Sequence, residues 1–187
     1  VLATPDKQNA NLQVVLALPL NDLHPDYPAL ALANHIFGSG GSSRLWKRIR
    51  ETDGLSYDVR SGVQWSNDDL NSRWVSSAIF APQNLPRVEA AWREELTRAV
   101  KDGFTQAELD QARNSLLNFR RLSRAQDNSV AAQAVGNLHL QRKFALSQQT
   151  DDRLAAVTLA QVNAAWQKYV DPARVVVGWA GDFKAVN

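Results

Sequence analysis

The positions of the hydrophobic residues first separate the strands from the rest of the chain. Leu12–Leu20 is an apolar, β-branched run, which is typical of a strand buried on both faces rather than half exposed. Leu55–Trp65 alternates with a period of two, and Ser72–Phe80 is a second strand-like run. Together they predict an antiparallel pair joined by the polar residues 66–71. Arg174–Ala180 predicts a last buried strand.

Most of the remaining chain has apolar residues at the spacing that is typical of helices. Thr105 with Glu108, and Thr158 with Gln161, have the spacing of capping boxes and therefore mark two helix N-termini. Apolar residues at spacings of three and four give the helical segments one hydrophobic face each. Helices are expected over residues 27–37, 43–53, 84–102, 105–119, 127–141 and 160–169, with a short helical turn over 148–157.

This order of elements predicts an α+β fold. We expect a two-layer sandwich in which helices pack on one face of a mainly antiparallel sheet. Gly38 is interpreted as the C-terminal stop of the first helix, and residues 38–43 as a flexible joint to the second. The chain is interpreted as one domain, 1–187, with a linker-like start over 1–11. Because it begins at Val1, we expect it to be excised from a longer chain.

Composition narrows the possible chemistry. The 187 residues are 44% hydrophobic and 21% charged, as in ordinary globular domains. The absence of Cys excludes disulfides, thiolate metal sites and a Cys nucleophile. A formal net charge of +2 gives no preference for nucleic acid, although a binder that uses the arginine-rich helix faces would show steep salt-dependent affinity. No apolar run is long enough for a membrane span. From the net charge and the absence of such a run, neither nucleic acid nor a membrane is an expected partner.

The chain contains no motif for metal or serine-hydrolase chemistry. The three histidines, His24, His35 and His139, have no second His or carboxylate at the spacing of a local zinc motif, and we assign them surface or structural roles. A Gly-x-Ser-x-Gly nucleophile elbow is absent. Residues 38–43 are glycine-rich and precede a helix, but they lack the Gly-Lys-Thr/Ser ending of a phosphate loop, which favours a hinge. The sequence therefore predicts no metal ligand and no catalytic residue in this chain by itself.

Arg50 and Tyr57 stand out as two groups suited to binding a peptide. Arg50 lies near the end of a basic helix and Tyr57 near the start of a strand, with Gly54 between them. A guanidinium can donate several hydrogen bonds to peptide carbonyls, and a phenol can donate one to a developing oxyanion. The alternative is structural: Arg50 pairs with a surface acid, while Tyr57 lies on the same side of its strand as Leu55 and Val59 and fills the core.

The segment from Gly38 to Tyr57, GSGGSSRLWKRIRETDGLSY, resembles the signature of the second domain in pitrilysin-type proteins, the insulinase and mitochondrial processing peptidase family of zinc metallopeptidases. The shared features are a glycine-rich turn, Ser-Arg-Leu, and Arg-Glu-x-x-Gly-Leu-x-Tyr. The resemblance is strongest to bacterial members and covers most of the chain. Further matches lie at residues 4–7, 26–30, 103–109, 156–162 and 180–183.

This resemblance implies the inactive, C-terminal-type domain of a zinc-dependent metalloendopeptidase. Two related halves of such an enzyme close around an unfolded peptide, and the other half carries the inverted zinc motif, so zinc is expected in a partner domain or subunit. By the same resemblance, Arg50 would hold the peptide main chain, and Tyr57 would position or stabilise the carbonyl oxygen under attack. The isolated domain would then be inactive by itself. The alternative is a catalytically dead scaffold or assembly subunit of the same fold.

The sequence leaves the compartment and the substrate preference open. Bacterial relatives of this type are often exported, so the periplasm is one candidate compartment. Whether the zinc-bearing half belongs to the same chain is also left open.

Overall fold

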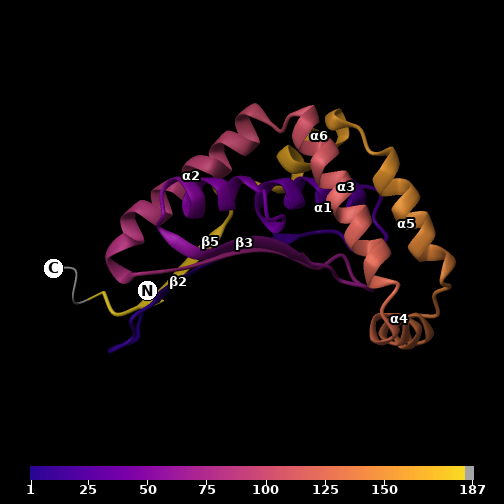
Figure 1. Ribbon diagram of the computed structural model, residues 1–187, viewed down its shortest axis with the longest axis horizontal. Coiled ribbons are helices and arrows are strands. Elements are labelled where there is room, and N and C mark those ends of the chain that lie inside the picture. The colour runs from indigo at the N-terminus through magenta and orange to yellow at the C-terminus, as the bar shows by residue number, and fades with distance from the viewer. Residues whose placement is uncertain (184–187) are drawn as a thin grey trace.

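The computed structural model describes residues 1–183 as one five-stranded sheet with helices along one face (Figure 1). The strands are β1 (Leu2–Ala3), β2 (Ala10–Leu18), β3 (Ser56–Gln64), β4 (Ser72–Phe80) and β5 (Val176–Gly181). Their order across the sheet is β1-β5-β2-β4-β3. All neighbouring strands are antiparallel except β1 and β5, which are parallel. The predicted two-layer α+β architecture and the β3–β4 pair are therefore confirmed, while the segment expected as a linker contributes β1 and the start of β2.

The sheet has one covered and one open face, so the prediction of strands buried on both faces is wrong for β2 and β5. In β2 the side chains of Leu12, Val14 and Leu16 are buried, whereas those of Asn11 and Val15 are exposed. No described helix covers the face on which the exposed residues lie (Figure 1). β-branched residues favour the strand conformation even where they face solvent, so the apolar run indicated a strand but not its burial.

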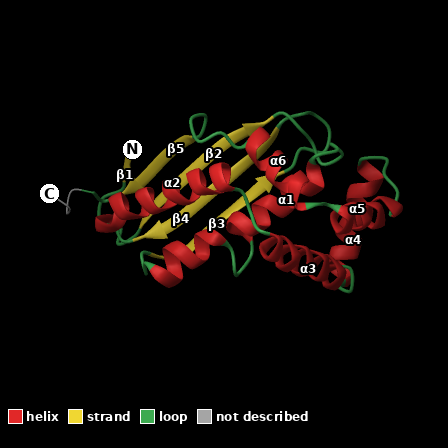
Figure 2. Ribbon diagram, turned by 90° about the horizontal axis from the view of Figure 1, so that it is seen from above, coloured by secondary structure: helices red, strands yellow, loops and turns green. Residues whose placement is uncertain are grey.

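Most helices lie close to the predicted ranges. Two differ, because the first helix continues through η1 and the turn expected over 148–157 is a longer helix. Both predicted capping boxes are present, at Thr105 with Glu108 and at Thr158 with Gln161. The short turn expected over 148–157 is a complete helix, and Figure 2 shows it with α4 beyond one end of the sheet. The helical elements are α1 (Tyr27–Asn34), η1 (His35–Ser39), η2 (Trp46–Thr52), η3 (Pro82–Asn84), α2 (Leu85–Asp102), α3 (Gln106–Ser123), α4 (Asp127–His139), α5 (Ala145–Ala156) and α6 (Leu159–Tyr169).

Gly38 does not end the first helix as predicted. The helix continues as the π-helical turn η1, in which the Gly40 amide donates to the His35 carbonyl at 3.1 Å. A side-chain Cβ at Gly38 would lie 2.4 Å from the hydroxyl oxygen and 2.7 Å from the backbone nitrogen of Ser61 in β3. The glycine is therefore required by the close approach of η1 to the sheet, a long-range contact that a stop signal read along the sequence does not reveal.

Aromatic side chains join the helices to the sheet. Trp74 of β4 is fully buried, and its ring centre lies 5.7 Å from that of Phe37 and 5.8 Å from that of Trp166. Its indole N–H donates a 2.9 Å hydrogen bond to the Asn34 side chain, which also accepts a 2.7 Å bond from the Ser61 hydroxyl. Buried polar groups are normally paired in this way. The network fixes α1 against β3 and β4, and so provides the frame for the candidate site.

Candidate functional site

Arg50 extends from η2 toward solvent. The helical segment buries Leu45 and Ile49 against the core and leaves Arg50 on its exposed side. The guanidinium carbon of Arg50 lies 4.4 Å from the centre of a Trp46 ring, and the Trp46 indole N–H donates a 3.2 Å hydrogen bond to Glu51. Within the described residues Arg50 has no ion pair, so the alternative in which it pairs with a surface acid is not found. Its N–H groups face solvent and can bind an oxygen of a ligand.

Tyr57 follows a sharp reversal of the chain. Gly54 has a φ of 61°, and the Leu55 amide donates a 2.9 Å hydrogen bond to the Ile49 carbonyl, which closes the turn between η2 and β3. Tyr57 then occupies a β-bulge, because Ser56 pairs with Phe80 while Asp58 pairs with the adjacent Ile79. The Tyr57 side chain is 57% exposed.

The bulge explains why the strict alternation predicted for this strand fails. Ser56 is buried, and its hydroxyl donates to the carbonyls of Ile79 at 2.6 Å and Asp58 at 2.8 Å. The extra residue in the bulge changes which face of the strand each side chain occupies, so Tyr57 does not lie with Leu55 and Val59 in the core. The structural alternative for Tyr57 is therefore wrong. Its hydroxyl makes no hydrogen bond with any described residue and is available as a donor.

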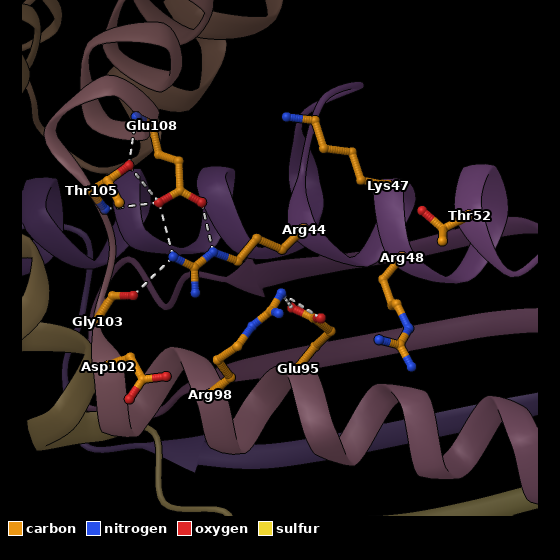
Figure 3. Close-up of a pocket in the computed structure, with 10 residues that line it drawn as sticks. All are labelled: Arg44, Lys47, Arg48, Thr52, Glu95, Arg98, Asp102, Gly103, Thr105 and Glu108. Carbon is orange, nitrogen blue, oxygen red and sulfur yellow. Dashed lines mark hydrogen bonds and ion pairs between the residues drawn. The ribbon is translucent and has the colours of Figure 1, made fainter.

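A charged groove lies between η2 and α2 (Figure 3). It has a volume of about 560 Å³. At one end Arg44 donates to both carboxylate oxygens of Glu108, at 2.6 and 2.9 Å, and to the Gly103 carbonyl at 2.9 Å. Along the α2 wall Arg98 is paired with the buried Glu95. The lining residues are Arg44, Lys47, Arg48, Thr52, Glu95, Arg98, Asp102, Gly103, Thr105 and Glu108.

Glu108 is the most strongly perturbed carboxylate in the groove. Burial by itself would raise the pKa of its carboxyl, but the hydrogen bonds from Arg44 and from the Thr105 backbone outweigh burial and lower the pKa to about 2. In the sequence, Glu108 is marked only as the N3 residue of a capping box. Its partner Arg44 is 64 positions away, and no local pattern connects them. The pair ties the start of η2 to the junction of α2 and α3.

Ion pairs neutralise much of the positive charge of the basic segment that contains η2. Arg48 binds Asp53 at 2.9 Å and Glu94 at 3.0 Å. Together with the Arg44 pair, these contacts neutralise two of the cations that suggested a nucleic-acid surface. The groove is therefore best explained as a structural contact between helices, whereas Arg50 remains without a counterion in the described part of the chain.

The histidines lie apart, and His24 and His35 have ordinary hydrogen-bond partners. The His24 ring accepts a 3.0 Å hydrogen bond from the Asp26 amide, and the His35 ring lies 3.2 Å from the Ser115 hydroxyl. Burial lowers the pKa of His35. Over residues 1–183 no group of three or more His, Cys, Asp or Glu side chains could hold a metal ion. In the same range, no helix has the length and apolar content that crossing a membrane requires.

The chain alone is expected to bind no stoichiometric zinc. A tight site needs at least three converging nitrogen, oxygen or sulfur ligands, and the described residues do not bring three together. The measurement is elemental analysis after equilibration with zinc and gel filtration. One retained zinc per chain at neutral pH would contradict the prediction.

Similar sequences occur in zinc proteases that are longer than this chain. A family model described as the peptidase M16 inactive domain matches residues 1–116. An uncharacterized zinc protease of Mycobacterium tuberculosis is 30% identical over 140 residues, which cover 73% of this chain and 31% of the relative. One from Bacillus subtilis is 29% identical over 134 residues, covering 72% of this chain and 32% of the relative. The chain thus spans about a third of the length of these curated relatives.

The same fold recurs in solved structures. The peptidase M16 inactive domain from Pseudomonas fluorescens has a TM-score of 0.83 at 24% identity, covering 96% of this chain and 42% of that chain. The inactive peptidase domain from Bordetella parapertussis has a TM-score of 0.76 at 20% identity and covers 91% of both chains. The second case shows that a domain of this extent has been solved by itself.

Proposed function

The chain belongs to the family of peptidase M16 inactive domains, and on that premise we propose that it binds substrate in a zinc-dependent metalloendopeptidase. In this proposal it closes over an unfolded peptide opposite a homologous domain that holds the zinc. The observation that carries the proposal is the exposure of Arg50 and Tyr57, which lie on either side of the η2–β3 turn and whose side-chain donors have no hydrogen-bond partner among residues 1–183.

The two side chains would divide the work by their chemistry. Arg50 has a planar fork of donors that can hold peptide carbonyl oxygens in a fixed orientation. Its stacking on Trp46 limits the conformations that it must give up on binding. Tyr57 has one hydroxyl donor, which suits the single oxygen that becomes negative when water attacks the scissile carbonyl. Neither group replaces a metal, so both act only when the zinc-bearing half is present.

Exposed apolar surface supports the existence of a partner half. None of the residues of α4 is buried, although the helix carries several large apolar side chains. Such surface is costly to leave in water and usually marks a contact. The chain also spans only about a third of the curated relatives. The most exposed large apolar residues at this end of the fold are Phe119, Leu122, Val135, Leu138 and Phe144.

Arg50→Ala is expected to raise the KM of the parent peptidase about 10-fold to 100-fold, because hydrogen bonds from a charged donor contribute about 1.5–3 kcal/mol. The effect on kcat should be smaller, since the peptide main chain is held both before and during the reaction. Steady-state kinetics with an internally quenched peptide measure both constants.

Arg87→Ala provides the matched control, because Arg87 is an exposed arginine of α2 with no assigned role. It should leave KM within about twofold of the parent value. Trp46→Leu removes only the stacking partner and should raise KM about 2-fold to 5-fold, in line with an exposed cation–π contact. Equal KM values for the Arg50→Ala and Arg87→Ala enzymes would remove Arg50 from the binding site.

A further inference from the structure

A cavity lies between α1, α3 and the end of β3. Tyr27, Ala31 and Asn34 line it from one face of α1, and Leu116 and Arg120 line it from α3. The cavity has a volume of about 180 Å³. An engineered cavity of about 150 Å³ in another protein binds benzene. The cavity in this chain therefore has room for one aromatic ring with a small substituent.

The walls of the cavity are largely apolar and partly open to solvent. Val63 and Trp65 contribute from the end of β3, and the Trp65 ring lies against the Tyr27 ring with centres 4.5 Å apart and planes tilted by 55°. Tyr27, Trp65 and Leu116 are each half-buried, so part of their apolar surface still contacts water. A bound aromatic ring would remove this surface from water, which favours an apolar guest.

The side-chain amide of Asn34 is an unpaired donor in the wall. Asn34 is only 6% exposed, and its side-chain oxygen accepts from the Trp74 indole at 2.9 Å and from the Ser61 hydroxyl at 2.7 Å. Because an indole N–H can only donate, its partner must be the oxygen of Asn34 rather than the nitrogen. The Asn34 NH2 group has no hydrogen-bond acceptor among residues 1–183. Buried donors are normally paired, so this group is suited to an oxygen of a guest molecule.

The cavity offers a charged guest no free counterion. Arg120 is the cation among the described lining residues, and Asp151 already pairs with it. Burial lowers the pKa of His35, which keeps its ring neutral at pH 7, and the ring lies 3.2 Å from the Ser115 hydroxyl. A carboxylate or an ammonium group would lose its hydration without gaining an ion pair. The cavity therefore favours an uncharged guest.

We propose that this cavity binds a small, uncharged aromatic molecule with one carbonyl oxygen. Its ring lies against Tyr27 and Trp65, and its oxygen accepts a hydrogen bond from the Asn34 amide. An aromatic amide of the size of benzamide has these features. Val63 in the wall lies six residues from Tyr57 along β3, which is roughly 20 Å. The ligand thus leaves the proposed peptide contact free, and its binding does not depend on the proposed function.

The first test is a titration of this chain with benzamide, followed by ¹H–¹⁵N NMR. The side-chain amide of Asn34 and the indole N–H of Trp65 should shift together and saturate with one Kd on the order of 1 mM, as for other ligands of about nine non-hydrogen atoms. The indole N–H of Trp179, in β5, is the internal control and should not shift. Shifts that do not saturate, or that omit Asn34, would overturn the proposal.

Benzoate tests the requirement for an uncharged guest. It has nearly the shape of benzamide but is ionised at neutral pH. It should therefore bind at least about tenfold more weakly, because its charge loses water without gaining a partner. Equal affinities for benzamide and benzoate would contradict the proposed class of ligand.

Two leucine substitutions test the location of the ligand. Ala31→Leu fills part of the cavity and should weaken benzamide binding at least about tenfold. Ala17→Leu places the same side chain on the open face of the sheet and should leave Kd within about twofold. Thermal unfolding establishes that both variants are folded, and Ala31→Val, which adds less volume, replaces an unfolded Ala31→Leu. An unchanged Kd in a folded Ala31 variant would place the ligand elsewhere and refute the site.

Discussion

Tyr57→Phe in the parent peptidase is expected to lower kcat about 10-fold to 1000-fold, as does loss of a single oxyanion donor in other hydrolases. The hydroxyl is exposed and has no partner among the described residues, so its removal costs the folded chain little. It would act on the oxygen that gains charge in the transition state, so KM should change much less than kcat. The measurement is kcat and KM with one peptide substrate for the two enzymes at equal zinc content.

Tyr169→Phe is the matched control, because it also removes a tyrosine hydroxyl. That hydroxyl donates a 2.8 Å hydrogen bond to Asp26 within the fold, so its loss should lower the melting temperature and leave kcat within about twofold. If Tyr57→Phe and the parent enzyme had the same kcat, Tyr57 would have no part in the chemical step.

Glu108→Gln is expected to lower the free energy of unfolding at neutral pH by up to about 3 kcal/mol, which corresponds to the displacement of the Glu108 pKa. That pKa falls from 4.5 to about 2 in the folded chain, where Arg44 and the Thr105 backbone outweigh the opposing effect of burial. A lowered pKa means that the stabilisation is complete above about pH 4.5 and is lost as the pH falls toward 2. The difference between wild type and Glu108→Gln should therefore shrink over that interval, as measured by urea unfolding.

Asp110→Asn is the control on the same helix. Asp110 pairs with Arg113 three residues later, but its side chain is 53% exposed, and such pairs contribute about 0.2–1 kcal/mol. A loss for Glu108→Gln that is as small as that for Asp110→Asn, or that stays constant from pH 7 to pH 3, would contradict the role assigned to the Arg44–Glu108 pair.

Several interactions between residues close in sequence were predicted correctly. The capping boxes at Thr105 and Thr158 formed as expected, because a side chain that bonds an amide three residues away needs no tertiary contact to define it. The β3–β4 pair followed from alternation and a short polar connection. The motif from Gly38 to Tyr57 likewise identified the family, because its residue types and spacing are properties of the sequence alone.

Side-chain direction was predicted less well. The alternation in β3 placed Tyr57 beside Val59 in the core, and the bulge after Ser56 reversed that assignment. The bulge is held by the Ser56 hydroxyl on the carbonyl of Ile79, which belongs to another strand. A single inserted residue changes which face of the sheet the neighbouring side chains occupy. The sequence of the strand by itself does not reveal that such a residue is present.

The sequence by itself determined the fold class, the two capped helix starts, the absence of cysteine chemistry and the two residues proposed to bind substrate. Each depends on composition or on contacts within a few positions. The tertiary structure decided that Arg50 and Tyr57 are exposed, with no hydrogen-bond partner for their side chains among residues 1–183, and that Arg44 binds Glu108 across 64 positions. These features depend on which elements become neighbours when the core is buried, and many arrangements of the same local elements would satisfy the sequence pattern equally well.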